Sequence, residues 1–120
     1  DYRRLNKNSK IDCYNIARIE PLLDSLRGAK YFASLDMFSG YYQVKIADEH
    51  KERTAFSTPC GFFQYVKMPF GLRNAPATFQ RMADKVFEGY IMSICVVYLD
   101  DIIVFSDTKE GLYENLQKSF

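Results

Sequence analysis

The sequence predicts an α+β domain in which an antiparallel sheet packs against helices. At residues 93–106, two apolar runs rich in β-forming residues meet at an acidic pair, which predicts a β-hairpin. A segment with helical periodicity precedes this hairpin, and short strand patterns separated by turn residues lie further upstream. Because the connections are short, neighbouring strands are expected to be antiparallel. At 120 residues with 48% hydrophobic content, the chain is long enough for one domain with a core.

The hairpin places Asp100 and Asp101 at its expected tip, between the runs SICVVYL and IIVFS. Strands this apolar suit a buried position, where an isolated charge is costly, so the carboxylates lie where solvent or a cation can reach them. Aspartate also favours turns for purely local reasons. From the hairpin alone, a structural turn and a metal site remain equally open.

The upstream elements follow in chain order. An apolar segment between Pro21 and Gly28 predicts a short helix that carries Leu22, Leu23 and Leu26. Residues 31–37 alternate as a strand, with residues 31, 33, 35 and 37 on one face and Asp36 on the other, near the strand end. Further antiparallel strands are expected at residues 43–46, 54–58 and 62–67.

Two helices complete the prediction. Asn74 can cap a helix with Pro76 in its first turn, and Gly89 is expected to end it. Its expected apolar face comprises Phe79, Met82, Ala83, Val86 and Phe87. Asp107 or Thr108 can cap a last helix, whose apolar side is expected to carry Leu112, Tyr113, Leu116 and Phe120.

Composition does not identify partners, because 16 basic and 15 acidic residues leave a net charge of +1. The three cysteines, Cys13, Cys60 and Cys95, form no metal-binding spacing with the single His50, which favours a reducing compartment. No apolar segment approaches the roughly 20 residues of a membrane span. The chain is therefore expected to be soluble and intracellular, with no membrane partner.

A second acidic position bears on whether the hairpin acids form a structural turn or a metal site. Asp36 at its strand end and the Asp100–Asp101 pair can bring three carboxylates together. Mg²⁺ takes oxygen ligands, and two ions about 4 Å apart can stabilise the attacking and leaving oxygens of phosphoryl transfer. Seen alone, Asp36 would more simply be a turn acid.

Three segments stand out in the sequence: LDMFSGYYQVKI, TAFSTPCGFFQYVKMPFGLRNAPATFQRM and VVYLDDIIVFS. In their order and spacing, they make the sequence resemble a reverse transcriptase of the gypsy-type branch of long-terminal-repeat retrotransposons. The resemblance covers residues 1–120 and implies a right-hand polymerase fold. The palm and part of the fingers would be present, and the thumb would be absent. Residues 1–10 and 48–67 would lie largely in the fingers. It implies an RNA-directed DNA polymerase that adds deoxynucleotides to a primer 3′ end by two-metal phosphoryl transfer, as part of a Pol polyprotein.

The resemblance also implies residue roles. The catalytic and metal-binding acids would be Asp36, Asp100 and Asp101, with the Met37 carbonyl as a further metal ligand, for two Mg²⁺ ions that Mn²⁺ can replace. The nucleotide site would comprise Phe38, Ser39, Gly40, Tyr41, Phe70 and Gly71, and Tyr98 and Leu99 would lie near primer or template. Packing roles for Phe70, Tyr98 and Leu99 stay open.

The implied partners are an RNA or DNA template with its primer, deoxynucleoside triphosphates, and the thumb, connection and RNase H segments of the same polyprotein. The implied location is cytoplasmic, in a virus-like particle. Without these segments, residues 1–120 alone are expected to be poorly active. Asn15 and Ala17 depart from the family, in which prolines are expected before the first helix.

Two rival interpretations remain open. Another palm-type nucleotidyl transferase, such as a nucleotide cyclase, would use similar acids, although MPFGLRNAPATFQ argues against it. An inactive retroelement relic or a nucleic-acid-binding remnant would keep the fold without the activity, although the intact acids argue against decay.

Overall fold

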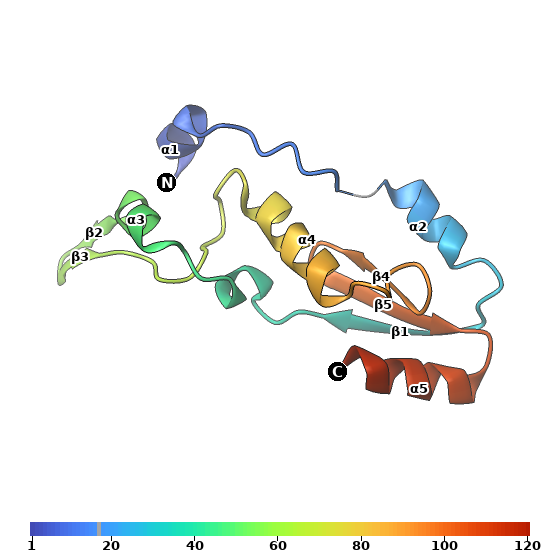
Figure 1. The fold of residues 1–120 in the computed structure, drawn as a ribbon. Helices are drawn as coiled ribbons and strands as arrows, with labels where there is room; N and C mark the ends of the chain where they lie inside the picture. Colours follow the sequence, from blue (N-terminus) through green and yellow to red (C-terminus); the bar gives the residue numbers. More distant parts are fainter. Residues whose placement is uncertain (17) are drawn as a thin grey trace. The chain divides into compact units, whose positions relative to one another are not determined.

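The computed structural model describes residues 1–16 and 18–120, so the predicted departure at Ala17 lies outside the described residues. The chain divides into two compact units (Figure 1). The first unit comprises Asp1–Cys13 and Ser39–Phe79, and the second comprises Tyr14–Phe38 and Gln80–Phe120. Both ranges expected to belong to the fingers, 1–10 and 48–67, fall in the first unit.

The second unit is built on a three-stranded antiparallel sheet with the strand order β1-β5-β4 (Figure 1). Its strands are β1 (Tyr31–Asp36), β4 (Cys95–Tyr98) and β5 (Asp101–Ser106). β5 is central, pairing with β1 from Tyr31 opposite Ser106 to Asp36 opposite Asp101. The predicted strand at 31–37 and the predicted hairpin are therefore confirmed.

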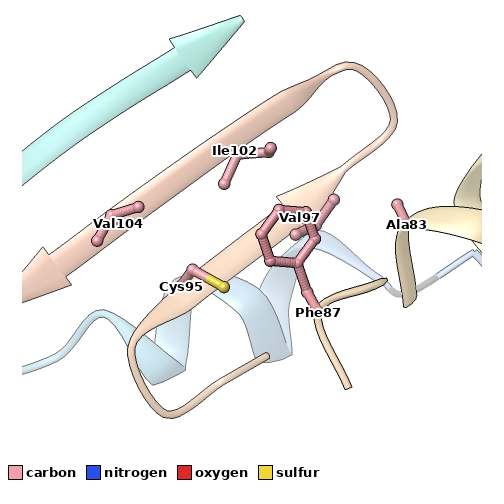
Figure 2. Close-up of a cluster of buried hydrophobic side chains, with 6 residues drawn as sticks. All are labelled: Ala83, Phe87, Cys95, Val97, Ile102 and Val104. Carbon is pink, nitrogen blue, oxygen red and sulfur yellow. The ribbon is translucent and has the colours of Figure 1, made fainter. Parts of the chain in front are cut away.

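Each face of this sheet packs against helices. Six buried side chains, drawn in Figure 2, form the larger cluster: Ala83, Phe87, Cys95, Val97, Ile102 and Val104. Leu112 and Leu116 of α5 (Lys109–Ser119) pack against the same cluster. Val96 and Phe105, which alternate with these residues along the strands, instead bury Leu22 of α2 (Ile19–Ser25). Both faces are covered because both carry apolar side chains, as the unbroken apolar runs predict.

The predicted helices are confirmed, with narrower apolar faces than expected. α4 spans Ala75–Val86, and it buries Phe79 and Ala83, but Val86 is 63% exposed. Tyr113 of α5 and Phe120, which follows the helix, are exposed, and Leu112 and Leu116 make the contact with the sheet. A helix touches a sheet along a strip of side chains, and residues at the edge of that strip reach solvent. No helix in the described ranges has the length and apolarity needed to cross a membrane.

The first unit has little regular structure. It contains the helices α1 (Arg3–Asn8) and α3 (Asp48–Lys51), the 3₁₀ helices η1 (Gly40–Gln43) and η2 (Glu52–Thr54), and the antiparallel pair β2 (Phe56–Thr58) and β3 (Gly61–Phe63). The first five residues of α4, which end with Phe79, also belong to it.

The strand predicted at 43–46 is wrong, and the strands predicted at 54–58 and 62–67 are shorter than expected. The chain turns through η1 and then makes a single bridge between Lys45 and Lys67. Two backbone hydrogen bonds flank that bridge, from Ile46 N to Val66 O at 3.1 Å and from Met68 N to Val44 O at 2.9 Å. Because η1 uses the residues that would extend the pairing, no longer ladder forms.

The cap of α5 gives a first stability prediction. Thr108, rather than Asp107, is the cap, since its Oγ1 accepts a hydrogen bond from Gly111 N at 3.1 Å. Thr108→Ala is expected to lower the free energy of unfolding by about 1 kcal/mol, because that amide loses its partner. Urea unfolding followed by circular dichroism measures the change, and Lys109→Ala, at the exposed first helical position, is the control expected to stay within about 0.5 kcal/mol of the parent. Equal stability of Thr108→Ala and the parent would show that the cap contributes nothing.

Candidate active site

Two of the three predicted catalytic acids are direct neighbours in the sheet. Asp36 ends β1, Asp101 begins β5, and the two are paired in register. Residues that oppose each other in an antiparallel pair project from the same face, so these carboxylates share one face of the sheet. Asp100 precedes Asp101, and its backbone oxygen accepts a hydrogen bond from Met37 N at 3.0 Å. The fold thus brings the three acids to one end of the sheet from two distant segments.

The hairpin tip differs from the prediction by one residue. Tyr98 pairs with Asp101, so Leu99 and Asp100 form the turn and Asp101 already belongs to the strand. Leu99 has a φ of 54°, in the left-handed region. This conformation costs a non-glycine residue about 1–2 kcal/mol. A leucine here must therefore be held by other contacts.

Gln80 supplies such a contact, and the sequence analysis missed it. Its side chain is 2% exposed, and Oε1 accepts a hydrogen bond from Leu99 N at 2.8 Å. Its Nε2 donates to Val97 O at 3.3 Å, so one side chain of α4 binds the backbone on both sides of Tyr98. The available signal was a glutamine in the apolar stripe of the helix, three residues before Ala83 and seven before Phe87.

The acids are electrostatically uncompensated. Burial raises the pKa of Asp100, and the neighbouring carboxylates of Asp36 and Asp101 raise it further. Asp100 Oδ1 is buried and has no hydrogen-bond partner among the residues that the structure describes. Within residues 1–16 and 18–120, neither lysine nor arginine forms an ion pair with any of the three acids. Burial is thus the larger cause of the raised pKa of Asp100, and repulsion by the two neighbouring carboxylates is the smaller one.

The residues present fit a divalent cation. A buried carboxylate oxygen without a partner, beside two further carboxylates, is a set of hard oxygen donors that lacks a positive charge. In the described part of the chain, however, no three acidic, histidine or cysteine side chains are gathered closely enough to hold an ion as they stand. The structure therefore brings the three acids together at the level of the backbone.

This electrostatic arrangement predicts a pH dependence of stability. A carboxyl whose pKa is raised by folding stabilises the fold fully below the unfolded value, near 3.9, and this contribution is lost as pH rises through the folded value. Between about pH 4 and pH 8, the metal-free protein should lose more stability than an Asp100→Asn variant, which cannot ionise at this position. Thermal unfolding of both proteins across this range, with EDTA present, measures the difference. Parallel pH profiles would show that Asp100 is not destabilised by its surroundings.

The residues predicted to bind nucleotide fall in both units. Phe38, which is 88% exposed, ends a segment of the second unit, whereas Ser39, Gly40, Tyr41, Phe70 and Gly71 belong to the first. Within the first unit, the Tyr41 and Phe70 ring centroids lie 5.0 Å apart, and Tyr41 meets Phe79 edge-on at 5.4 Å. The structure therefore brings Tyr41 and Phe70 together. Phe70 is half exposed, which leaves ring surface available in addition to its packing role.

The turns that adjoin Tyr41 and Phe70 contain residues with a left-handed backbone conformation. Ser39 has a φ of 51° and Gly71 a φ of 89°, so both are in the left-handed region. Asn6 Nδ2 donates to Gly71 O at 2.8 Å, and Arg73 N donates to Asn6 Oδ1 at 2.8 Å. The Asn6 side chain of α1 thus forms hydrogen bonds with two backbone groups of the loop that follows Phe70, Gly71 O and Arg73 N.

The remaining predicted contacts have distinct environments. Met37 packs its side chain against the larger core cluster, and metal binding by its carbonyl stays a prediction. Tyr98 is exposed at the end of β4, and Leu99 is half buried in the turn. Neither residue is confined to the core.

Comparison with known proteins gives a consistent result. Residues 1–120 match the family model described as "Reverse transcriptase (RNA-dependent DNA polymerase)". The chain is 44% identical over 117 residues to the retrovirus-related Pol polyprotein from transposon opus of Drosophila melanogaster, covering 98% of this chain and 12% of the polyprotein. It is 41% identical over 120 residues to that from transposon 297 of the same organism, covering 100% of this chain and 11% of the polyprotein.

Solved structures agree with the fold. The crystal structure of the prototype foamy virus protease-reverse transcriptase matches with a TM-score of 0.86 and 25% identity, over 98% of this chain and 16% of that one. The foamy viral protein in complex with an RNA/DNA hybrid matches with a TM-score of 0.87 and 24% identity, over the same shares. The chain thus spans a small part of the proteins it matches.

Proposed function

Because the chain belongs to the reverse transcriptase family, we propose that the protein containing it adds deoxynucleotides to a primer 3′ end under the direction of an RNA template. The observation that carries this proposal is the set of acids at one end of the sheet, with the unpartnered carboxylate oxygen of Asp100 among them. Structural acids at a turn would be expected to find donors, because a buried polar group without a partner is costly.

The proposed metal ligands are Asp36, Asp100 and Asp101, together with the carbonyl of Met37. When bound, two Mg²⁺ ions would activate the primer 3′ oxygen and stabilise the charge that develops on the leaving pyrophosphate. Mn²⁺, another cation that suits oxygen ligands, could substitute. The carboxylates contribute by position: the pairing of β1 with β5 and the Gln80 hydrogen bonds fix the backbone that carries them.

Aromatic and backbone groups have the proposed task of binding the incoming nucleotide. Tyr41, held by Phe70 and Phe79, would lie beneath the sugar, and the left-handed turn at Ser39 would present backbone to the triphosphate. Phe38, Gly40 and Gly71 complete the proposed set. Tyr98 and Leu99 adjoin the acids in sequence and are proposed to lie near the primer end.

The proposed partners are the template and primer, deoxynucleoside triphosphates, and the thumb, connection and RNase H segments of a Pol polyprotein. The similar foamy viral protease-reverse transcriptase has been solved in complex with an RNA/DNA hybrid, which supports a nucleic-acid partner. We also propose an intracellular, cytoplasmic location, because the free thiols of Cys13, Cys60 and Cys95 suit a reducing compartment.

Primer extension tests the proposal directly. The protein with its native flanking segments should extend a DNA primer on a homopolymer RNA template with Mg²⁺ or Mn²⁺, and EDTA should stop the reaction. Residues 1–120 alone should extend it poorly, because they would lack some of the contacts that hold the reacting groups in line. Such contacts can lower an activation barrier by about 7–11 kcal/mol. Template binding without any extension by the flanked protein would instead favour a nucleic-acid-binding remnant.

A further inference from the structure

A polar network within the second unit continues behind Gln80. Tyr14 Oη donates a hydrogen bond to Asp84 Oδ2 at 2.6 Å, and Gln80 Nε2 donates to Asp84 Oδ1 at 2.9 Å. A single carboxylate therefore joins a residue 70 positions upstream to the glutamine that binds the hairpin. The network connects Tyr14 through Asp84 and Gln80 to the backbone of Leu99.

Asp84 favours one of the two orientations of the Gln80 carboxamide. An amide can be reversed about its last bond, which exchanges its donor and acceptor ends. An ionised Asp84 accepts hydrogen bonds only, and so does Val97 O, so both require the Nε2 end of Gln80. Oε1 is then left facing Leu99 N, the one donor among the three partners. Without the Asp84 carboxylate, Nε2 would keep only the longer contact to Val97 O, and the orientation would rest on that contact and on the hydrogen bond from Leu99 N.

Tyr14 in turn holds Asp84. The Arg81 guanidinium carbon lies 4.6 Å above the Tyr14 ring, so the ring is fixed by a cation–π contact while its hydroxyl binds the carboxylate. The hydrogen bond to Asp84 raises the pKa of Tyr14, with smaller contributions from burial and from the Asp84 charge. The phenol therefore remains a hydrogen-bond donor at neutral pH.

From this geometry we propose that Asp84 and Tyr14 are positioning residues for the Leu99–Asp100 turn, acting through the orientation of Gln80. The inference rests on the proposed function for its catalytic consequence, because Asp100 is a proposed metal ligand. The turn needs such support, since Leu99 adopts a left-handed φ of 54° that its own side chain disfavours.

Three substitutions in the protein with its native flanking segments test the inference. Asp84→Ala removes the carboxylate, Tyr14→Phe removes one hydroxyl and keeps the ring on Arg81, and Asp84→Asn is the conservative exchange. In Asp84→Asn, the amide oxygen can still accept from Gln80, and the Tyr14 hydroxyl can rotate to accept from the new amide nitrogen. Tyr113→Phe and Glu88→Ala, at exposed positions outside the network, are matched controls.

Hydrogen exchange measures the turn without reference to activity. Peptides that contain the Leu99 amide should exchange about three- to tenfold faster in Asp84→Ala and about two- to threefold faster in Tyr14→Phe, as expected for loss or weakening of a hydrogen bond. Peptides from the interior of β5 should be unchanged. Asp84→Asn should restore exchange to within about twofold of the parent, because its amide oxygen can still accept from Gln80. Asn also fills the space of Asp84, so the faster exchange in Tyr14→Phe is the result that a merely space-filling Asp84 would not produce.

Steady-state primer extension measures the catalytic consequence. Asp84→Ala should lower kcat about tenfold with the KM for deoxynucleotide changed less than about threefold, because a shifted turn misplaces groups that act in the transition state. Unchanged exchange at Leu99 in both Asp84→Ala and Tyr14→Phe would overturn the inference. Faster exchange with unchanged kcat would overturn its catalytic part. If the parent extends no primer, the proposed function fails, while the exchange data still decide whether the network positions the turn.

Discussion

Asp100→Asn is expected to abolish primer extension, lowering kcat by at least about 10³-fold, as loss of several kcal/mol of metal-supplied charge stabilisation requires. Asn keeps the shape of Asp100 but lacks the charge that would attract a cation. The Asp100 side chain is well suited to this role, because its Oδ1 is buried beside two other acids and has no hydrogen-bond partner in the described part of the chain. Primer–template affinity should stay within about twofold, since most of that affinity comes from contacts between basic groups and phosphates.

Asp107→Asn is the matched control, because Asp107 is an exposed acid just beyond β5 and lies outside the proposed site. It should extend primers at the parental rate. Single-turnover extension with saturating deoxynucleotide separates the chemical step from product release, and a binding titration measures affinity. An Asp100→Asn protein that retains more than about a tenth of the parental rate would contradict the assignment.

The sheet of the second unit could be predicted because its signals are local. Alternation along 31–37 and the two apolar runs of the hairpin each encode a strand within a few residues, and the acids then follow from strand ends. The face carrying Leu35 and Met37 packs against the core, whereas Phe32, Ser34 and Asp36 are exposed, as the alternation requires. The same reasoning placed α4, since its caps and its periodicity lie within the helix itself.

The strands of the first unit were predicted less well, because the local sequence pattern does not determine which segments pair with each other. Residues 43–46 have strand-like composition, but they follow a 3₁₀ helix and gain only one bridge partner, Lys67. Whether such a segment becomes a strand depends on a partner about 20 residues away. The hairpin tip was displaced by one residue for a related reason. The left-handed Leu99 is supported by Gln80, a contact that no pattern within the hairpin encodes.

Gln80 is an example of a residue whose role the resemblance to a family did not indicate. The motif identified the acids and the aromatic residues, yet the network of Tyr14, Asp84 and Gln80 emerged only from hydrogen-bond geometry. A buried side-chain amide such as that of Gln80, with its hydrogen-bond partners present, strongly constrains the backbone that it binds, because reversing or unpairing such an amide in the interior is costly. The proposed support of the turn thus comes from residues on α4 and near the start of the second unit.

Tyr41→Val is expected to raise the efficiency of ribonucleotide incorporation relative to deoxynucleotide about 10- to 100-fold. The proposed position of the ring beneath the incoming sugar leaves no room for a 2′ hydroxyl, and removing a steric clash of this size changes discrimination by one or two powers of ten. The Tyr41 ring is well fixed for this purpose, since it contacts Phe70 at 5.0 Å and meets Phe79 edge-on at 5.4 Å.

Two neighbouring variants make the test of Tyr41 specific. Tyr41→Phe keeps the ring and loses only the hydroxyl, so it should retain the parental ratio of the two nucleotides. Tyr42→Val removes the adjacent ring, which contacts Phe70 from another direction at 5.5 Å, and it should also leave the ratio unchanged if Tyr41 alone meets the sugar. Single-nucleotide kinetics give kcat/KM for each substrate, and thermal unfolding checks that each variant is folded. If Tyr41→Val retains the parental ratio, or if Tyr42→Val changes it equally, the aromatic cluster stabilises the first unit and Tyr41 does not select the sugar.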